Sequence, residues 1–192
     1  KIKKKKIEFC SFKYENLNFD LVKLSDKELY SLYTFFIKFS NEERVFFPFP
    51  LFKPVDITFD ELRKNYKDYL SENSWVYFLL LFKNDLIGFT LLKKIGFKKN
   101  INTESKSPTS GIFIDKKFRG KNIGSILQKF ITLQCNLLGI ENIYVRVSDK
   151  NIGSQKVYRN NGFKKTGKTF NVEQNGFKWT DEEYILKLND NN

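Results

Sequence analysis

The sequence contains no histidine, no methionine and only two cysteines, Cys10 and Cys135. Without histidine there is neither a histidine-based nucleophilic triad nor a histidine-containing zinc site. The two cysteines have no metal-ligand spacing, and isolated thiols in a chain of this size favour a reducing compartment. We therefore expect a cytoplasmic protein that binds no metal.

Long apolar runs are also missing. The longest, Trp75–Phe82, has the length of a strand, whereas a membrane-spanning helix needs roughly 20 apolar residues. The basic start Lys1–Lys6 is not followed by the apolar segment of a signal peptide. We expect no membrane partner.

The charge is strongly positive, with 34 Lys and Arg against 22 Asp and Glu and a formal net charge of +12. Such a balance can indicate a nucleic-acid or membrane partner. The lysines are scattered, however, and the chain is also rich in Asn, Ile and Phe, a mixture typical of a biased genome composition. The scattered positive charge favours a role in attracting a small polyanionic ligand. A basic nucleic-acid-binding domain stays as an alternative.

The pattern of apolar and turn residues predicts an α/β (α+β) fold with a mixed sheet, in a single domain over 1–192. Residues 1–16 are expected to be a frayed or edge segment. Capping boxes at Ser25 and Glu28 and at Thr58 and Glu61 mark two helix starts. The expected N-terminal elements are a strand over 19–24, a helix over 26–39, a second helix after Thr58, and strands over 75–82 and 86–94 joined at Asn84–Asp85.

The C-terminal half predicts a second series of alternating strands and helices. Gly139 is expected to end the long helix, and Asn175–Gly176 to form a hairpin turn. The expected elements are a buried strand over 111–114, a helix from near 122 to Gly139, a strand over 143–147, a helix over 151–160, and strands over 163–170 and 183–188.

The turn over 119–125, which joins a buried strand to the long helix, has the properties of an anion-binding site. The first amides of a helix lack intrahelical acceptors and lie at the positive end of the helix dipole. Gly120 and Gly124 allow close approach to the backbone, while Arg119 and Lys121 add positive charge. A pyrophosphate suits such a site. Neither GxxxxGK[ST] nor a Rossmann GxGxxG is present, and a plain strand-to-helix turn remains the alternative.

A second motif over 151–163, NIGSQKVYRNNGF, directly follows the next strand. The two motifs together resemble the GNAT acetyltransferase superfamily, which has [QR]xxGx[GA] at a helix start and NxxAxxxYxxxGF after the next strand. The sequence departs from the first pattern at Asn122, where Gly is usual, and from the second at Ser154, where Ala is usual. The positions of the two patterns are occupied by Arg119, Asn122, Gly124, Asn151, Ser154, Tyr158, Gly162 and Phe163.

The resemblance implies a mostly antiparallel sheet of about seven strands, flanked by about four helices, in which 111–114 and 143–147 form a splayed parallel pair. Acetyl-CoA would lie between these two strands. The backbone of 112–114 would pair with the pantetheine amides, and the amides of 120–125 would hold the pyrophosphate. The implied cofactor-binding residues are Ile112, Phe113, Ile114, Arg119, Gly120, Lys121, Asn122, Ile123, Gly124, Ser125, Asn151, Ser154 and Tyr158.

The implied reaction is direct attack of an amine on the thioester in a ternary complex. Tyr158 would protonate the leaving thiolate, and the amide of Ile114 would stabilise the oxyanion. The general base is not evident, because 107–114 contains no carboxylate and Asp115 is expected at the surface. The remaining candidates are Glu42, Glu43, Glu104 and 181–183, or a water relay.

The acceptor is an amine of a small metabolite, an amino sugar or a peptide. The segment 41–53 either forms an aromatic wall for this acceptor, through Phe46, Phe47 and Phe49, or closes the core beneath a loop. Two alternative functions stay open, an acyl-CoA sensor without turnover and a protein or peptide N-terminal acetyltransferase. The sequence also leaves open whether the chain forms a homodimer.

Overall fold

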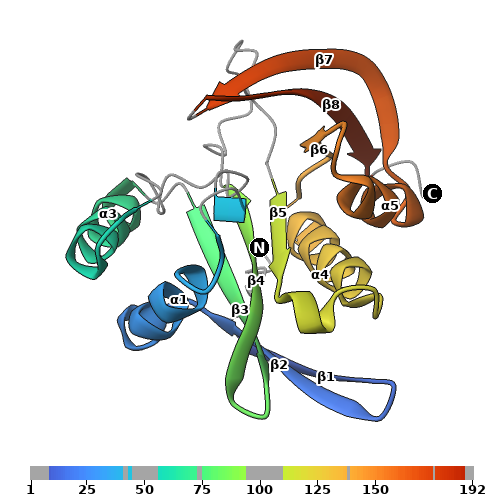
Figure 1. The fold of residues 1–192 in the computed structure, drawn as a ribbon. Helices are drawn as coiled ribbons and strands as arrows, with labels where there is room; N and C mark the ends of the chain where they lie inside the picture. Colours follow the sequence, from blue (N-terminus) through green and yellow to red (C-terminus); the bar gives the residue numbers. More distant parts are fainter. Residues whose placement is uncertain are drawn as a thin grey trace.

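The computed structural model describes residues 9–40, 43–44, 56–72, 75–93, 110–137, 139–174 and 176–188. Three sequence-based candidates lie outside these ranges: the aromatic residues Phe46, Phe47 and Phe49, and the acids Glu42 and Glu104. Among the described residues, the strands form a five-stranded sheet in the order β1-β2-β3-β4-β5 and a three-stranded sheet in the order β6-β8-β7 (Figure 1).

All strand pairs within the two sheets are antiparallel. The larger sheet contains β1 (Phe9–Tyr14), β2 (Leu17–Lys23), β3 (Trp75–Phe82), β4 (Asp85–Lys93) and β5 (Ser110–Ile114). The smaller contains β6 (Asn142–Ser148), β7 (Lys164–Gln174) and β8 (Phe177–Lys187). The described α-helices are α1 (Leu29–Phe36), α3 (Phe59–Glu72), α4 (Ile123–Leu137) and α5 (Ile152–Asn160).

Both predicted capping boxes are present. The Glu28 carboxylate accepts hydrogen bonds from the backbone and hydroxyl of Ser25, ahead of a short 3-10 turn that leads into α1. The Glu61 carboxylate accepts hydrogen bonds from the backbone amide and the hydroxyl of Thr58. The Thr58 hydroxyl in turn accepts from the Glu61 amide. Each box therefore satisfies backbone donors that a helix start leaves free, as the sequence predicted.

The β3–β4 hairpin confirms the predicted strands and shifts the predicted turn by one residue. Lys83 and Asn84 have φ angles of 51° and 68°, and Phe82 lies opposite Asp85. Two consecutive positive φ angles in a two-residue loop suit the right-handed twist of the flanking strands. The turn therefore lies at Lys83–Asn84 and not at Asn84–Asp85.

The described residues form eight strands, in keeping with the expected number of about seven; the additional strand, Phe9–Tyr14, pairs with β2 at an edge of the larger sheet. The final strand also begins at Phe177, earlier than the predicted start at 183, because its first residues pair with the end of β7. Those residues are largely polar, so their alternation does not reveal a strand from sequence alone.

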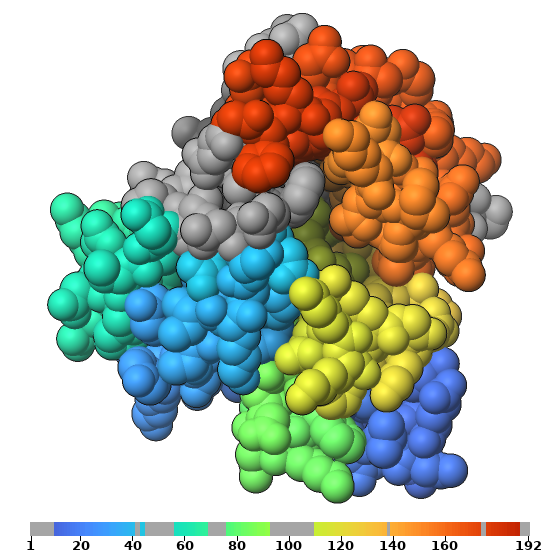
Figure 2. Space-filling view, in the orientation of Figure 1, coloured from blue at the N-terminus to red at the C-terminus, as the bar shows by residue number. Residues whose placement is uncertain are grey.

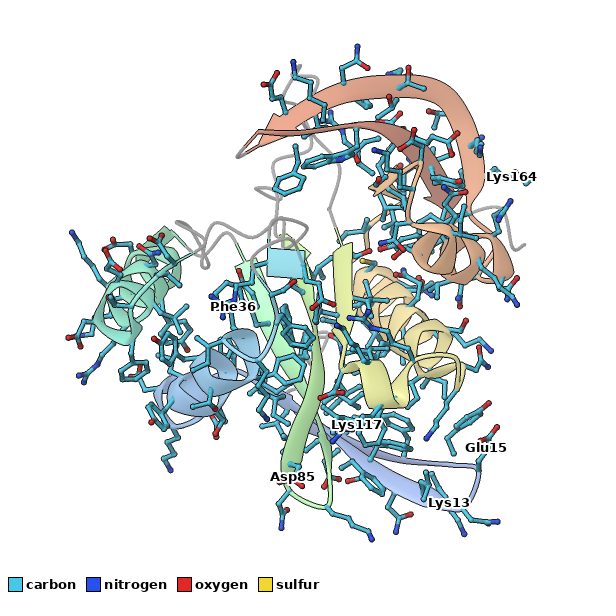
Figure 3. The ribbon with its side chains drawn as sticks, viewed as in Figure 1. Lys13, Glu15, Phe36, Asp85, Lys117 and Lys164 are labelled. Carbon is cyan, nitrogen blue, oxygen red and sulfur yellow. The ribbon has the colours of Figure 1, made fainter. Side chains whose placement is uncertain are left out.

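The larger sheet is buried on both faces. Helices α1 and α3 cover one face and α4 covers the other (Figure 1). Alternate residues of β4 belong to different cores: Phe89 and Leu91 pack with α1, while Leu92 packs with Ile131 of α4. Charged side chains lie at the outside, and Figure 3 shows Lys13 and Lys164 far apart on the molecule.

The two sheets meet beside β5 and β6, which belong to different sheets and do not pair with each other. Helix α4 connects them along the chain. The two strands of the predicted splayed pair are therefore neighbours that do not bond to each other, and each lies at the edge of its sheet. Within the described ranges, no helix is both long and apolar enough to cross a bilayer.

Candidate active site

A cavity of about 940 Å³ lies between β5, the turn before α4, and the start of α5. Figure 2 shows the hollow between the yellow surface of the turn and α4 and the orange surface of α5. Its volume falls in the range of small-molecule and cofactor sites. Every residue of the predicted cofactor set except Lys121 lines it.

The turn before α4 contains two residues in the left-handed backbone conformation. Gly120 has a φ of 77° and Asn122 a φ of 57°, so asparagine takes a left-handed conformation where the family usually has glycine. The amides of residues 120–124 donate to none of the residues that the structure describes. These donors open onto the cavity at the positive end of α4.

Gly124 has a packing role that the sequence did not reveal. A Cβ atom added at this position would lie 3.1 Å from Cγ2 of Val157 and 3.6 Å from Cδ1 of Ile114. Glycine therefore lets α4 approach α5 closely. By contrast, a Cβ at Gly120 would meet nothing within 4 Å, so Gly120 is needed for its backbone conformation.

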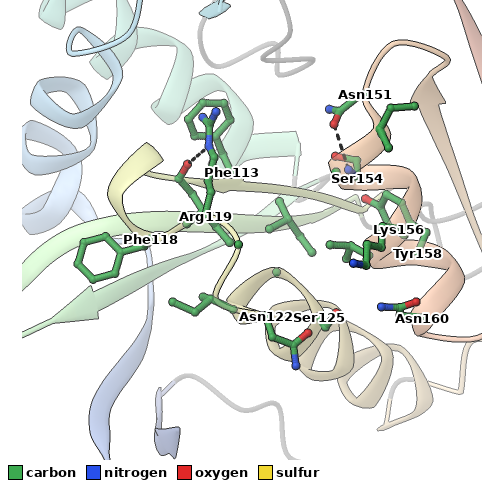
Figure 4. Close-up of a pocket in the computed structure, with 18 of the residues that line it drawn as sticks. Phe113, Phe118, Arg119, Asn122, Ser125, Asn151, Ser154, Lys156, Tyr158 and Asn160 are labelled. Atoms are coloured by element: carbon green, nitrogen blue, oxygen red, sulfur yellow. Dashed lines mark hydrogen bonds between the residues drawn. The ribbon is translucent and has the colours of Figure 1, made fainter. Parts of the chain in front are cut away.

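The Arg119 side chain is turned toward β5. Its Nε donates to the carbonyl oxygen of Ile114 at 2.9 Å, and the guanidinium lies 5.5 Å from the centre of the Phe113 ring (Figure 4). One terminal nitrogen lies 4.0 Å from the Glu43 carboxylate. Arg119 thus braces the end of β5, in addition to adding charge beside the cavity.

The cavity contains basic residues that the sequence reasoning missed. Lys150 and Lys156 line it together with Asn160, whereas Lys121 is not among the described lining residues. The Lys121 ammonium instead lies 5.5 Å from the centre of the Phe118 ring. Lys156 and Asn160 are one helical turn apart on α5 and so share a face, a spacing that could have indicated them.

The backbone of β5 alternates between bonding to β4 and facing the gap. The Asp115 amide donates to Ile87 at 2.8 Å, and Phe113 lies opposite Phe89. In an antiparallel pair, hydrogen-bonded positions alternate, so Ile112 and Ile114 turn their amides and carbonyls away from β4. Both amides and the Ile112 carbonyl therefore face the cavity like the edge of a sheet, while the Ile114 carbonyl accepts the hydrogen bond from Arg119.

Asn151 caps the start of α5. Its Oδ1 accepts from the Ser154 amide at 3.0 Å, as Figure 4 shows. One position before the β6–α5 turn, the Ser148 hydroxyl accepts from the Lys150 amide at 3.2 Å. The asparagine that begins the second motif therefore fixes the helix start that carries Tyr158 into the cavity wall.

Tyr158 is buried, with 5% of its surface exposed, although it lines the cavity. Burial raises the pKa of its phenol to about 12, against a smaller opposing effect from its hydrogen bond with Ser110. The Tyr158 ring packs edge-on against Phe163. The hydroxyl is therefore held in its protonated form, as a proton donor requires.

Carboxylates near the cavity differ in their surroundings. Glu43 lines the cavity and forms an ion pair with Lys116 at 3.1 Å. Asp115 accepts from the Lys117 amide at 2.9 Å and so stabilises the turn, in keeping with its predicted surface role. Asp181 of β8 is partly buried, and burial raises the pKa of its carboxyl.

The fold and the cavity define an α+β protein in which a helix start with free amides lies beside two strands that do not pair with each other. Residues 36–163 match the profile of the acetyltransferase (GNAT) family, and the chain belongs to this family. The comparison with curated proteins found no match.

Solved structures share the fold at low sequence identity. RimL, a ribosomal L7/L12 α-N-protein acetyltransferase in complex with coenzyme A, is 18% identical with a TM-score of 0.73, covering 93% of this chain and 98% of its own. Spermidine N-acetyltransferase from Vibrio cholerae in complex with CoA and spermine is 20% identical with a TM-score of 0.69, covering 88% and 95%. An N-acetyltransferase from Staphylococcus aureus Mu50 is 17% identical with a TM-score of 0.67, covering 89% and 99%.

Proposed function

We propose that this protein transfers an acetyl group from acetyl-CoA directly to an amine within a ternary complex. The observation that carries this proposal is the set of amides at 120–124, which have no acceptor among the described residues and open onto the cavity between β5 and β6. A diphosphate matches such donors in charge and in hydrogen bonding.

The residues around the cavity fit coenzyme A along its length. The outward backbone groups of Ile112 and Ile114 suit the amides of a pantetheine arm, because an edge strand binds extended amide groups. Lys150 and Lys156 supply positive charge near the start of α5 for phosphate groups. Asn151 and Ser154 hold the wall of the same cavity.

The thioester supplies an activated acetyl group, and the chain supplies polarisation and a proton. The outward amide of Ile114 is the donor that stabilises negative charge on the carbonyl oxygen. The hydroxyl of Tyr158 donates to the departing sulfur. A tyrosine is protonated at neutral pH, and burial, which raises its pKa to about 12, extends the protonated range to higher pH.

The acceptor is an amine of a metabolite, an amino sugar or a peptide. Proteins of similar fold include a ribosomal L7/L12 α-N-protein acetyltransferase and a spermidine N-acetyltransferase, so both kinds of amine are candidates to test. The competing function is an acyl-CoA sensor without turnover, which the lack of a carboxylate on β5 favours. A protein or peptide N-terminal acetyltransferase is the second alternative within the family.

Calorimetry with acetyl-CoA and a thiol-release assay separate these functions. The amines are spermidine, a peptide with a free N-terminal serine and a nucleotide-linked amino sugar. We expect binding of acetyl-CoA and thiol release with at least one amine. Binding without release on any amine indicates a sensor, and the absence of binding overturns the proposal.

A further inference from the structure

Asp181 belongs to neither sequence motif and is not among the lining residues, but it pairs with a residue that lines the cavity. In the register of the small sheet, Asp181 of β8 is directly opposite Ser148 of β6. Directly opposed residues of an antiparallel pair project from the same face, with Cβ atoms about 5 Å apart. Ser148 lines the cavity, so the Asp181 carboxylate is one side chain away from its wall.

The surroundings of Asp181 keep its carboxylate basic. Burial raises its pKa most strongly, and the charge of Asp149, the residue that follows β6, adds to this effect. The hydrogen bond from Trp179 Nε1, at 2.8 Å, and the charge of Arg146 act in the opposite direction. From β7 the opposing residue is the uncharged Phe170, and Glu183 follows along the same face of β8.

Three other described acids, Glu43, Asp115 and Glu183, have partners of their own. Glu43 forms ion pairs with Lys116 and Arg119, and Asp115 caps the turn that follows β5. The Glu183 carboxylate accepts from the Thr166 hydroxyl at 2.9 Å. Asp181 combines partial burial, no ion pair among the described residues within contact distance, and a position opposite a cavity-lining residue.

We propose that Asp181 is the general base of the transfer, and that the acceptor amine enters beside Ser148 to reach it. The inference rests on the proposed function. The ammonium gives one proton to the Asp181 carboxylate, and the neutral nitrogen forms the bond to the acetyl carbon. As the carbon–sulfur bond breaks, Tyr158 protonates the thiolate and regains its proton from the nitrogen. Asp181 then releases its proton to solvent.

The first test compares Asp181→Asn with Asp181→Glu, using the panel amine that releases thiol fastest with the wild-type protein. We expect the Asn variant to lose about 100-fold in kcat/KM for the amine, the lower end of typical general-base contributions. We expect the KM of the Asn variant for acetyl-CoA to stay within twofold of the wild-type value. The Glu variant should recover part of the lost kcat/KM. Glu173→Gln is the control, since this exposed carboxylate on β7 pairs only with Lys178 among the described ion pairs.

The second test measures the pH dependence of kcat/KM. If Asp181 had only a structural role, substitutions around it would not shift the acidic limb of this profile in a predictable direction. Activity rises as Asp181 loses its proton. Arg146→Gln and Trp179→Phe each remove an effect that lowers the pKa of Asp181, so both move the acidic limb to higher pH. Asp149→Asn removes an effect that raises it, so the limb moves to lower pH.

The outcomes separate this inference from the function itself. If the wild-type protein releases no thiol on any amine, the proposed function fails and Asp181 has no reaction to serve. If the wild-type protein turns over while Asp181→Asn keeps kcat/KM within threefold and the same acidic limb, only the role of Asp181 is overturned. If the acidic limb of kcat/KM moves to higher pH in the Arg146 variant and to lower pH in the Asp149 variant, Asp181 is the general base.

Discussion

At the scale of single residues, the site depends on backbone conformations and contacts more than on reactive side chains. Asn122 takes a positive φ in the anion-binding turn, and Gly124 lets two helices touch. Tyr158 is held protonated by burial. These three residues belong to the two sequence motifs, and the structure shows a separate physical reason for each.

Substitution at Gly124 tests the contact between α4 and α5. We expect Gly124→Ala to destabilise the protein by about 1–3 kcal/mol, because the new methyl group overpacks against Val157. Adding Val157→Ala should restore part of the loss, and a double-mutant cycle by urea denaturation measures the coupling. Gly120→Ala is the contrast, since its cost of about 1–2 kcal/mol comes from the positive φ and no neighbouring truncation relieves it.

Removal of the Tyr158 hydroxyl tests the proton donor. We expect Tyr158→Phe to lower kcat at least about 100-fold and to leave acetyl-CoA affinity within a few-fold. Because the pKa of Tyr158 is raised to about 12, no loss of activity from its ionisation is expected between pH 7 and 10. Single-turnover thiol release measures both effects, and unchanged turnover at every pH removes Tyr158 from the mechanism.

At the scale of elements, the helix starts were readable from sequence because a capping box places two side chains at a fixed local spacing. The Ser25 and Thr58 boxes form as predicted. The small sheet was harder to predict, since the first half of β8 is polar and its pairing with β7 depends on a distant strand. Local patterns therefore located helices better than edge strands.

The Thr58–Glu61 box gives α3 a predictable dependence on pH. Hydrogen bonds from the Thr58 backbone and side chain lower the pKa of Glu61 below its usual value of 4.5. Their stabilising effect is present above the unfolded pKa and is lost as the pH falls through the lower folded value. Thermal melts from pH 7 to 3 should therefore fall less steeply in Glu61→Gln than in the wild-type protein. If the Tm of both proteins falls equally with pH, the Glu61 carboxylate does not contribute this pH-dependent stability.

At the scale of the whole molecule, the site lies where the edge strands of the two sheets are neighbours but do not hydrogen-bond to each other. β5 ends one sheet and β6 ends the other, and α4 spans the connection with its start at the gap. The backbone edge of β5 and the amides before α4 therefore face one cavity. The net charge of +12 adds a general attraction for a polyanion.

Acetyl-CoA should stabilise the folded protein as a whole. At a concentration about 100 times its Kd, a ligand that binds only the folded state adds about 2.7 kcal/mol. For a chain of this size, that corresponds to a rise in Tm of roughly 5–10 °C, which differential scanning fluorimetry can measure.

Duplex DNA is the matched comparison for that measurement. It should give only weak binding that salt abolishes, since no described site joins basic residues to base-reading elements. A large stabilisation by DNA with none by acetyl-CoA would support the nucleic-acid alternative instead.

The sequence by itself determined the helices, the hairpin and the two motifs, because caps, turns and apolar periodicity act between residues close along the chain. It also indicated the anion-binding turn, whose free amides follow from any helix start. Only the tertiary structure decided which groups line the cavity. Lys156 lines it, whereas the Lys121 ammonium lies by the Phe118 ring. The structure also showed that Gly124 allows close packing of α4 against Val157. Asp181 comes to lie opposite Ser148 through strand pairing, a contact between residues far apart in the chain that no local pattern encodes.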